Sequence, residues 1–483
     1  MSSSSTNPAA DWPRWRVFPP IALGVIMATL DASVVNIALP TLQRSFHASL
    51  STVEWVALAY SLTLTGVLLA AGRLADARGR RRIYGLGLLG FTIASLLCGL
   101  APDVNTLIAL RALQGFCAAF VSANGSALLV QAFPIEERGR ALGAFGAMVG
   151  VGLAIGPPLG GMVVAHASWR WIFLVNIPLG LLAWNLLQRR VAADGPPQAI
   201  TPSWSDRVQP LLWALGLVGV MAAVTRAPEH GVAEPIVLTC AIAGVALLTA
   251  FLVTQSRARD PLLPLDLVFG PLGAAVSLTF LGQLLTVAVG FLMPLVLEES
   301  AGLTAAQSGA WLAVLPGAAL FCAPVAGRLA DRLGTRTLTV SGMAITVAGL
   351  FLLSRLGVMP MGAPLVIGLA LVGIGQGLFA VPNASALLSL VPPERLGVAS
   401  GLQGTTRSLG IASGVALAGA LLTARYLTHS GVELHLGTHG GLDRGSFVAA
   451  THEVFTLLTV LAAGATGLAW RVRPRATQGP SVA

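Results

Sequence analysis

The sequence GRLADARGRRR occupies residues 72–82, and its first five letters recur as GRLAD at residues 327–331. A second pair of segments repeats alongside it, because NGSALL at residues 124–129 corresponds to NASALL at residues 383–388. The two pairs are offset by 255 and 259 residues. Such nearly equal offsets predict two homologous halves within one chain.

Long apolar runs separate these motifs and determine the class of protein. The 483 residues are 55% hydrophobic and only 10% charged, whereas a soluble domain carries about 25% charged residues. Runs of about 20 apolar residues recur through the chain, and each is long enough to cross about 30 Å of hydrocarbon. The polar segment 1–16 lacks the features of a cleavable signal peptide, so we expect the first span to act as the insertion signal.

The pattern predicts an all-α, polytopic membrane protein with fourteen transmembrane helices. A cytoplasmic tail (1–16) is expected to precede a six-helix bundle at 17–190. Two inserted helices at 208–254, a second six-helix bundle at 271–470 and a cytoplasmic tail at 471–483 are expected to follow. The expected spans are 17–39, 52–71, 83–101, 105–127, 139–165, 171–188, 208–225, 235–254, 272–297, 308–327, 337–354, 363–389, 397–423 and 451–470.

The basic residues test this arrangement. All 29 of them are arginines, of which 21 fall in the tails and loops expected to be cytoplasmic and 6 in the outer loops. This bias follows the positive-inside rule, so we expect a cell (inner or plasma) membrane protein with both termini in the cytoplasm. Because a Walker A loop needs a lysine, the lack of any lysine also excludes ATP-driven transport by this chain.

Asp31 is the only acid well inside an expected span, and Arg111 and Arg407 are the basic residues within spans. Burial of an isolated carboxyl group in a low dielectric favours its protonated form. We hypothesise that Asp31 carries a coupling proton and that Arg111 tunes its ionised form. Two alternatives remain open: a permanent Asp31–Arg111 pair that only fixes two helices, or an Asp31 that binds cationic drug while the proton binds elsewhere.

The loop at 72–82 resembles the signature loop of the major facilitator superfamily, which acts there as a latch between the two halves. The resemblance implies a gating role for five residues, of which Asp76 is suited to cap a helix N-terminus. The segment LIALRALQGFCAA at 107–119 is similar to the family's fourth-helix motif, whose arginine assists proton transfer and corresponds here to Arg111. The five gating residues are Gly72, Asp76, Arg80, Gly327 and Asp331.

GLAIGPPLGG at 152–161 resembles the fifth-helix motif of the antiporters in this superfamily. Its Gly152, Gly156 and Gly160 share one helical face and permit close helix contact, while Pro157 bends the helix. The stretches 30–40 and 168–180 are similar to signatures of the fourteen-helix drug:proton antiporters (EmrB/QacA-type multidrug exporters). Leu58 stands where some of those exporters carry a second acid, which weakens any claim of dicationic substrates.

Polar residues within the spans are candidates for lining a substrate cavity. For Arg407 two readings stay open, contact with an anionic substrate or with Glu298, and hydrogen bonding to helix-end carbonyls. Asn124 and Asn383 repeat across the halves, so a scaffold role is also open for them. The other cavity candidates are Asn36, Gln114, Gln283, Gln376 and Gln403.

Taken together, the resemblance and the residues imply a proton-driven efflux antiporter that exports small lipophilic drugs, dyes or antibiotics by alternating access. The alternative is a proton-coupled uptake symporter, or an exporter of a specific metabolite, in the same superfamily. No nucleophile–base pair or metal-ligand cluster stands out, so we expect no enzymatic activity, no metal and no cofactor beyond protons as coupling ion. The expected partners are the small-molecule substrate and the lipid bilayer, without nucleic acid; we expect a monomer, with an adaptor protein to be considered in a double-membrane bacterium.

Overall fold

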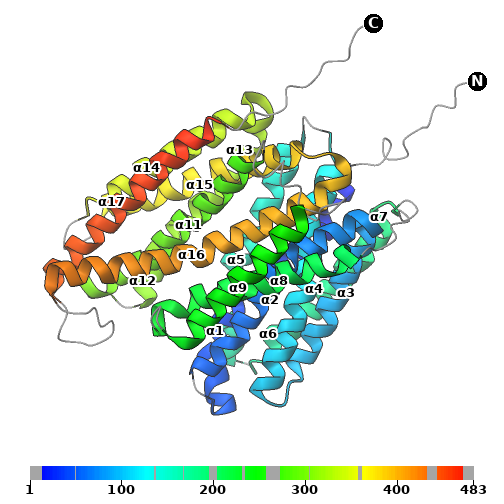
Figure 1. Ribbon diagram of the computed structural model, residues 1–483, viewed down its shortest axis with the longest axis horizontal. Coiled ribbons are helices and arrows are strands. Elements are labelled where there is room, and N and C mark those ends of the chain that lie inside the picture. Colours follow the sequence, from blue (N-terminus) through cyan, green and yellow to red (C-terminus); the bar gives the residue numbers. More distant parts are fainter. Residues whose placement is uncertain are drawn as a thin grey trace, which may run out of the picture. The chain divides into compact units, whose positions relative to one another are not determined.

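The structure is a computed structural model in which every regular element of the described residues is a helix (Figure 1). The expected all-α class is therefore confirmed. Within the described residues, twelve helices are long and apolar enough to cross a membrane. The described residues are 14–48, 50–134, 137–166, 168–194, 204–230, 234–256, 272–303, 305–356, 362–431 and 443–471.

The described helices coincide with all fourteen expected spans, but the count of fourteen stays a prediction. Helix α5 (Arg138–His166) is not among the twelve, and the apolar part of α8 (Trp204–His230) is the shorter stretch Val208–Val224. The chain divides into two compact units, residues 1–214 with 391–404 and residues 215–390 with 405–483. The expected domain boundaries remain a prediction as well.

In the first unit, α2 packs against α4, α1 against α5, and α3 against α4 and α7. The helices α6 and α7 form one nearly continuous segment that is interrupted at Val175. Besides α5, the helices of this unit are α1 (Phe18–Phe46), α2 (Leu50–Arg78), α3 (Arg80–Gly99), α4 (Val104–Ala132), α6 (Trp171–Leu174) and α7 (Asn176–Arg190).

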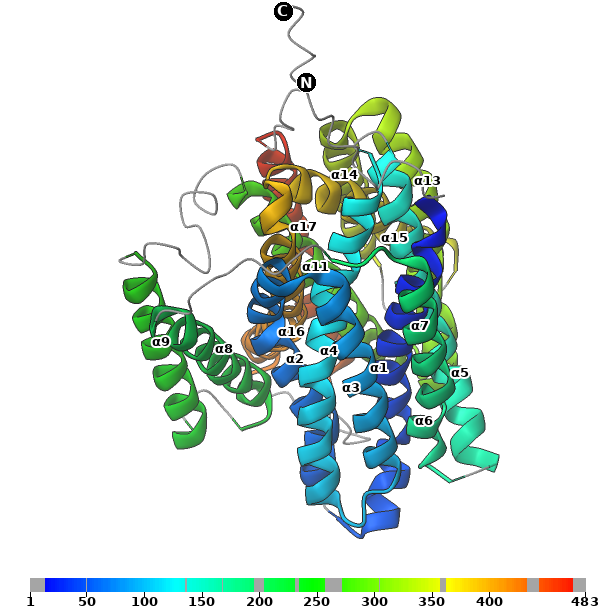
Figure 2. The same cartoon turned by 90° about the vertical axis from the view of Figure 1, so that its right-hand side faces the viewer.

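In the second unit, α15 lies between α13 and α14, and α17 packs against α14 and α11. Helix α8 belongs to this unit from residue 215 onward. This part of α8 lies beside α9 (Figure 2), where a Cβ atom at Gly244 would stand 2.6 Å from the amide nitrogen of Val220. The remaining helices are α9 (Pro235–Ser256), α11 (Gly273–Leu295), α12 (Ala305–Leu312), α13 (Val314–Leu333), α14 (Thr335–Leu353), α15 (Ala363–Ser389), α16 (Leu396–Ser430), whose first residues belong to the first unit, and α17 (Arg444–Ala469).

The internal repeat reappears in the packing. In α4 a Cβ atom at Gly115 would lie 2.4 Å from the carbonyl oxygen of Tyr60 in α2, and in α15 one at Gly373 would lie 2.2 Å from that of Leu315 in α13. Tyr60 and Leu315 are separated by the same number of residues as the two GRLAD motifs. Gly115 and Gly373 are separated by nearly the same number of residues as the second pair of repeated motifs. Both units thus use a glycine at the same crossing because no side chain fits between the backbones.

The glycines of the helix-five motif bring α5 close to α1. A Cβ atom would stand 1.9 Å from Thr29 Oγ1 at Gly152 and 1.7 Å from Ser33 Oγ at Gly156, distances at which two atoms overlap. Gly160 follows on the same face. The Ser33 hydroxyl also donates to the Gly152 carbonyl at 3.5 Å. The expected close helix contact is therefore present, and it places α1, which carries Asp31, firmly in the first unit.

Candidate functional site

Asp31 and Arg111 form an ion pair inside the first unit. Helix α1 carries the carboxylate and α4 carries the guanidinium, and Arg111 Nη1 lies 2.6 Å from Asp31 Oδ2. Each residue is only 1% exposed. Removing two charges from water costs several kcal/mol per ion, which only a close and well-bonded pair offsets. Arg111 is therefore stable at this depth because it has Asp31 as a partner.

The second oxygen of Asp31 is also fully used. Oδ1 accepts hydrogen bonds from Gln114 Nε2 at 3.1 Å and from Asn176 Nδ2 at 3.0 Å. The same two amides donate to the Ser95 hydroxyl at 3.2 and 3.0 Å. Gln114 Oε1 in turn accepts from Arg111 Nη1 at 2.6 Å. The site is thus a hydrogen-bonded network of buried side chains from α1, α3, α4 and α7 rather than an isolated carboxyl group.

Arg111 has further contacts that do not depend on Asp31. Its Nε donates to the carbonyl oxygen of Val56 at 3.0 Å, and its guanidinium lies 4.3 Å from the ring centroid of Tyr60. Gly115 lets α4 approach α2 closely enough for this contact. Cation–π contact and the carbonyl acceptor hold the guanidinium in place. These contacts therefore hold the Arg111 guanidinium in addition to its ion pair with Asp31.

Two members of the network were not identified from the sequence. Ser95 is one of many serines in apolar runs, and nothing local distinguishes it. Asn176 lies in the 168–180 stretch that resembles the drug:proton antiporters, and an asparagine within an apolar span was the available signal. Gln114, a predicted substrate-cavity residue, is fully buried and donates a hydrogen bond to Asp31.

The latch residues meet at the start of α16. The carboxylate of Asp76 accepts hydrogen bonds from the backbone amides of Gly397 and Val398, both at 2.9 Å. Arg80 Nη2 lies 2.7 Å from Asp76 Oδ1. A Cβ atom at Gly72 would stand 2.0 Å from the Gly397 carbonyl oxygen, so only glycine fits. Asp76 therefore caps a helix N-terminus, where its negative charge is favourable.

Arg80 connects this cap to other parts of the first unit. Its Nη1 donates to Gln131 Oε1 at 3.0 Å, and its Nη2 also donates to the Pro393 carbonyl oxygen. In the repeated motif, Gly327 lies within α13, while the side chain of Asp331 lies outside the described residues.

The remaining cavity candidates belong to different units: Gln403 to the first, and Gln283, Gln376 and Arg407 to the second. Gln283, Gln376 and Gln403 are half-buried, and Arg407 is exposed on α16. Glu298, one of the partners expected for Arg407, accepts a hydrogen bond from the Ser308 hydroxyl at 2.9 Å. The side chains of Asn36 and Pro157 lie outside the described residues.

The two repeated asparagines have structural contacts. The amide of Asn124 donates to the Phe120 carbonyl within its own helix at 2.8 Å. Asn383 donates to the Ala275 carbonyl and to the Thr279 hydroxyl, both at 2.9 Å. These contacts favour the scaffold reading for both residues.

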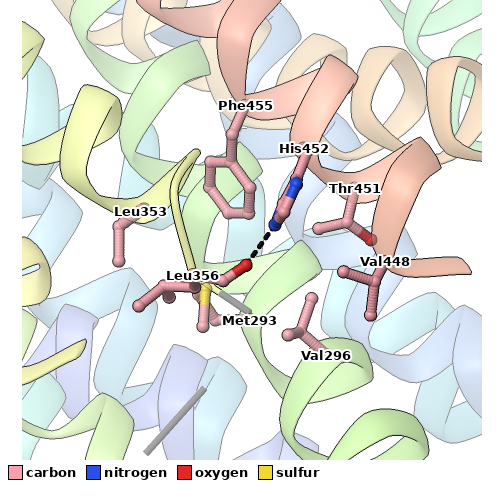
Figure 3. Close-up of a pocket in the computed structure, with 8 residues that line it drawn as sticks. All are labelled: Met293, Val296, Leu353, Leu356, Val448, Thr451, His452 and Phe455. Atoms are coloured by element: carbon pink, nitrogen blue, oxygen red, sulfur yellow. Dashed lines mark hydrogen bonds between the residues drawn. The ribbon is translucent and has the colours of Figure 1, made fainter. Parts of the chain in front are cut away.

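A small cavity in the second unit contains none of the candidate residues (Figure 3). In it, His452 Nε2 contacts the Leu356 carbonyl oxygen beyond the end of α14. The other lining side chains are mostly apolar: Met293, Val296, Leu353, Val448, Thr451 and Phe455. The lining joins α11, α14 and α17 and contributes two polar side chains, those of Thr451 and His452.

Comparison with known proteins assigns this architecture to a family. The model of the Major Facilitator Superfamily matches residues 21–414 and again 272–481. The puromycin resistance protein pur8 of Streptomyces alboniger is 35% identical over 463 residues, which cover 92% of this chain and 89% of the relative.

Other relatives have different functions. The riboflavin transporter RibZ of Clostridioides difficile is 32% identical over 83% of this chain and 87% of its own. The tetracenomycin C resistance and export protein of Streptomyces glaucescens is 31% identical, over 85% of this chain and 76% of its own. The crystal structure of the human organic anion transporter MFSD10 matches with a TM-score of 0.69 at 15% identity, over 95% of this chain and 99% of that one, which shows the shared fold. The chain belongs to the major facilitator superfamily, in which its relatives include antibiotic-resistance proteins.

Proposed function

We propose that this transporter is a proton-driven efflux antiporter for small lipophilic drugs, dyes or antibiotics, with Asp31 as the proton carrier. The observation that carries the proposal is the buried network of Asp31 with Arg111, Gln114 and Asn176. Resistance and export functions among the relatives support efflux. The riboflavin transporter supports the second candidate, transport of one specific metabolite in either direction.

The hydrogen bonds suggest how proton uptake is coupled to movement. Three donors surround the two oxygens of Asp31, an arrangement that suits an ionised carboxylate because it can only accept. A protonated carboxyl group has a donor of its own and would face Arg111, Gln114 or Asn176 as a second donor. Protonation therefore requires α1, α4 or α7 to rearrange. That requirement is what links a proton to a conformational change in alternating access.

The energy of one proton is sufficient for efflux. A membrane potential of about 100 mV contributes roughly 2.3 kcal/mol per charge, and each pH unit adds about 1.4 kcal/mol. One proton per cycle sustains a substrate gradient on the order of a hundredfold. The proposed location is the cell membrane, with both termini in the cytoplasm, the monomer as functional unit and no other cofactor.

Arg407 is proposed to face the substrate path. It lies roughly 16 Å along α16 from Leu396, at 1.5 Å per residue, and so inside the membrane span to which this helix belongs. Its side chain is exposed, and a guanidinium at that depth is costly against hydrocarbon. A water-filled path is the surrounding that stabilises it, and the half-buried Gln283 and Gln376 of the same unit are further lining candidates.

Transport in proteoliposomes tests the proposal. Purified protein is assayed with puromycin and with ethidium, with and without an imposed pH gradient. We expect the wild type to accumulate substrate only with the gradient, and Asp31→Asn to lose at least about tenfold of that transport while retaining substrate exchange at equal pH. Asp31→Glu is the control that keeps the carboxyl group.

Two results would contradict the proposal. Wild-type transport that persists after the gradient is collapsed would exclude proton coupling, and full gradient-driven transport by Asp31→Asn would exclude Asp31 as the carrier. A purely structural ion pair has a different signature. In that case the neutral double variant Asp31→Asn, Arg111→Gln would restore coupled transport that each single variant loses.

A further inference from the structure

The first turn of α3 has an unfavourable composition for a helix start. It contains Arg80, Arg81 and Arg82 and no acidic residue, although the N-terminus of a helix has a partial positive charge. The preceding Gly79 adopts φ 101° and provides no side-chain cap. This turn is also the loop that presents Arg80 to Asp76. Something outside the loop must therefore stabilise it.

A carboxylate from a distant part of the chain fills this role. Asp194, four residues beyond the end of α7, accepts a hydrogen bond from the amide of Arg81 at 3.1 Å on Oδ1 and from the amide of Arg82 at 2.8 Å on Oδ2. A Cβ atom at Gly79 would stand 2.4 Å from Asp194 Oδ2, so the glycine leaves room for the carboxylate. Arg81 Nη2 adds contacts to the carbonyl oxygen and side chain of Gln188 at 2.9 and 2.7 Å.

Two carboxylates near the turn at Gly79 thus each cap the N-terminus of a different helix. Asp76 caps α16 through Gly397 and Val398, and Asp194 caps α3. Arg80 is the residue between them, since its backbone opens the turn that Asp194 caps and its side chain binds Asp76. A change in the cap of α3 can therefore reach the cap of α16 through Arg80.

We propose that Asp194 is a positioning residue for the latch: it holds the first turn of α3 so that Arg80 stays directed at Asp76 and Asp76 stays on the N-terminus of α16. Without Asp194, three adjacent arginines and uncapped amides favour fraying of that turn. Arg80 then loses its orientation, and the contact of Asp76 with α16 opens more often. The inference rests on the proposed function only in that the latch opens during alternating access.

The test measures access to the latch in the full-length protein in membrane vesicles. Ala399, which is 2% exposed beside the capped residues, is replaced by cysteine, and its reaction with a membrane-impermeant maleimide is followed against the parent without that cysteine. We expect Asp194→Ala to raise the labelling rate about fivefold, the factor that corresponds to a helix cap of typical strength. Asp194→Asn keeps one acceptor but lacks the charge, so its labelling rate should lie between those of the protein with Asp194 and of Asp194→Ala.

Asp103 provides a matched control. It is an exposed aspartate that caps a different helix, α4, by accepting from the amide of Thr106 at 2.9 Å. Hydrogen bonds from the Thr106 hydroxyl and then its amide hold the pKa of the Asp103 carboxyl below its usual value, as expected for a working cap. Asp103→Ala should leave the labelling of the cysteine at position 399 unchanged.

The outcomes separate the role of Asp194 from general loosening. Equal increases in Asp103→Ala and Asp194→Ala, or no increase in Asp194→Ala, would overturn the inference. Labelling needs neither substrate nor a proton gradient, so failure of the Asp31 experiment would leave this result valid. Thermal unfolding of both variants shows whether they lose similar stability, in which case a difference in labelling is specific to the latch.

Discussion

At the residue scale, the amide of Asn176 donates to Asp31 Oδ1 and to the Ser95 hydroxyl, both at 3.0 Å. Asn176→Ala removes one of the three donors that suit the ionised carboxylate and leaves Gln114 in place. A hydrogen bond to a charged group is worth about 1.5–3 kcal/mol. We therefore expect protonation to become easier and the pH of half-maximal transport to rise by about one unit. Proteoliposome transport measured from pH 5 to pH 9 checks this.

Asn124→Ala is the control for that shift. Asn124 is equally buried, but its amide donates to the Phe120 carbonyl of its own helix and not to the Asp31 network. Its pH profile should keep the wild-type midpoint. If both variants shifted the midpoint equally, Asn176 would have no specific effect on the proton site.

Arg407 also gives a prediction at this scale, because an exposed guanidinium inside a span attracts anions. Arg407→Gln is expected to reduce export of the anionic dye fluorescein at least about tenfold relative to export of ethidium, a cation. Arg407→Lys keeps the positive charge and should therefore retain most of the export of fluorescein relative to ethidium. Equal loss of both dyes would instead indicate a structural role for Arg407.

At the scale of elements, the contact between α1 and α5 depends on small residues. Gly156→Val would place atoms on Ser33 Oγ, which already stands 1.7 Å from the position of a Cβ atom. Overpacking costs about 1–3 kcal/mol, and the displaced α1 would carry Asp31 away from Arg111. We expect a lower midpoint of thermal unfolding together with loss of proton-driven transport. Gly464→Ala in α17, where no other atom lies within 4 Å of the added Cβ, should change neither property.

At the scale of the whole molecule, the prediction of fourteen spans depends on α8, whose apolar stretch is the shorter Val208–Val224. Alkaline phosphatase fused after residue 232 should be active, because the segment between α8 and α9 is expected outside. Fusions after residue 471 should be inactive, and a fluorescent protein there should fluoresce. An inactive fusion at 232 would show that α8 and α9 do not cross the membrane; an active one at 471 would show an odd number of spans.

Part of the fold and of the candidate site could be predicted from local sequence. Apolar runs predicted every helix that carries a site residue, because a 20-residue apolar segment is stable in a bilayer only as a helix. Asp31 and Arg111 stood out for the same reason, since an ionisable residue within such a run needs a partner or a function. The repeated GRLAD motif likewise predicted a helix cap at Asp76, which the bonds to Gly397 and Val398 confirm.

The sequence by itself therefore determined the all-α membrane class, the internal repeat and the two charges at the centre of the first unit. Only the tertiary structure decided that Ser95 and Asn176 complete the network of Asp31, and that Asp194 caps a helix which begins more than a hundred residues earlier. The physical reason is that hydropathy acts along the chain. Which polar side chains meet depends instead on helix rotation and spacing, and here glycines such as Gly115 and Gly156 set both by allowing contacts that no larger residue permits.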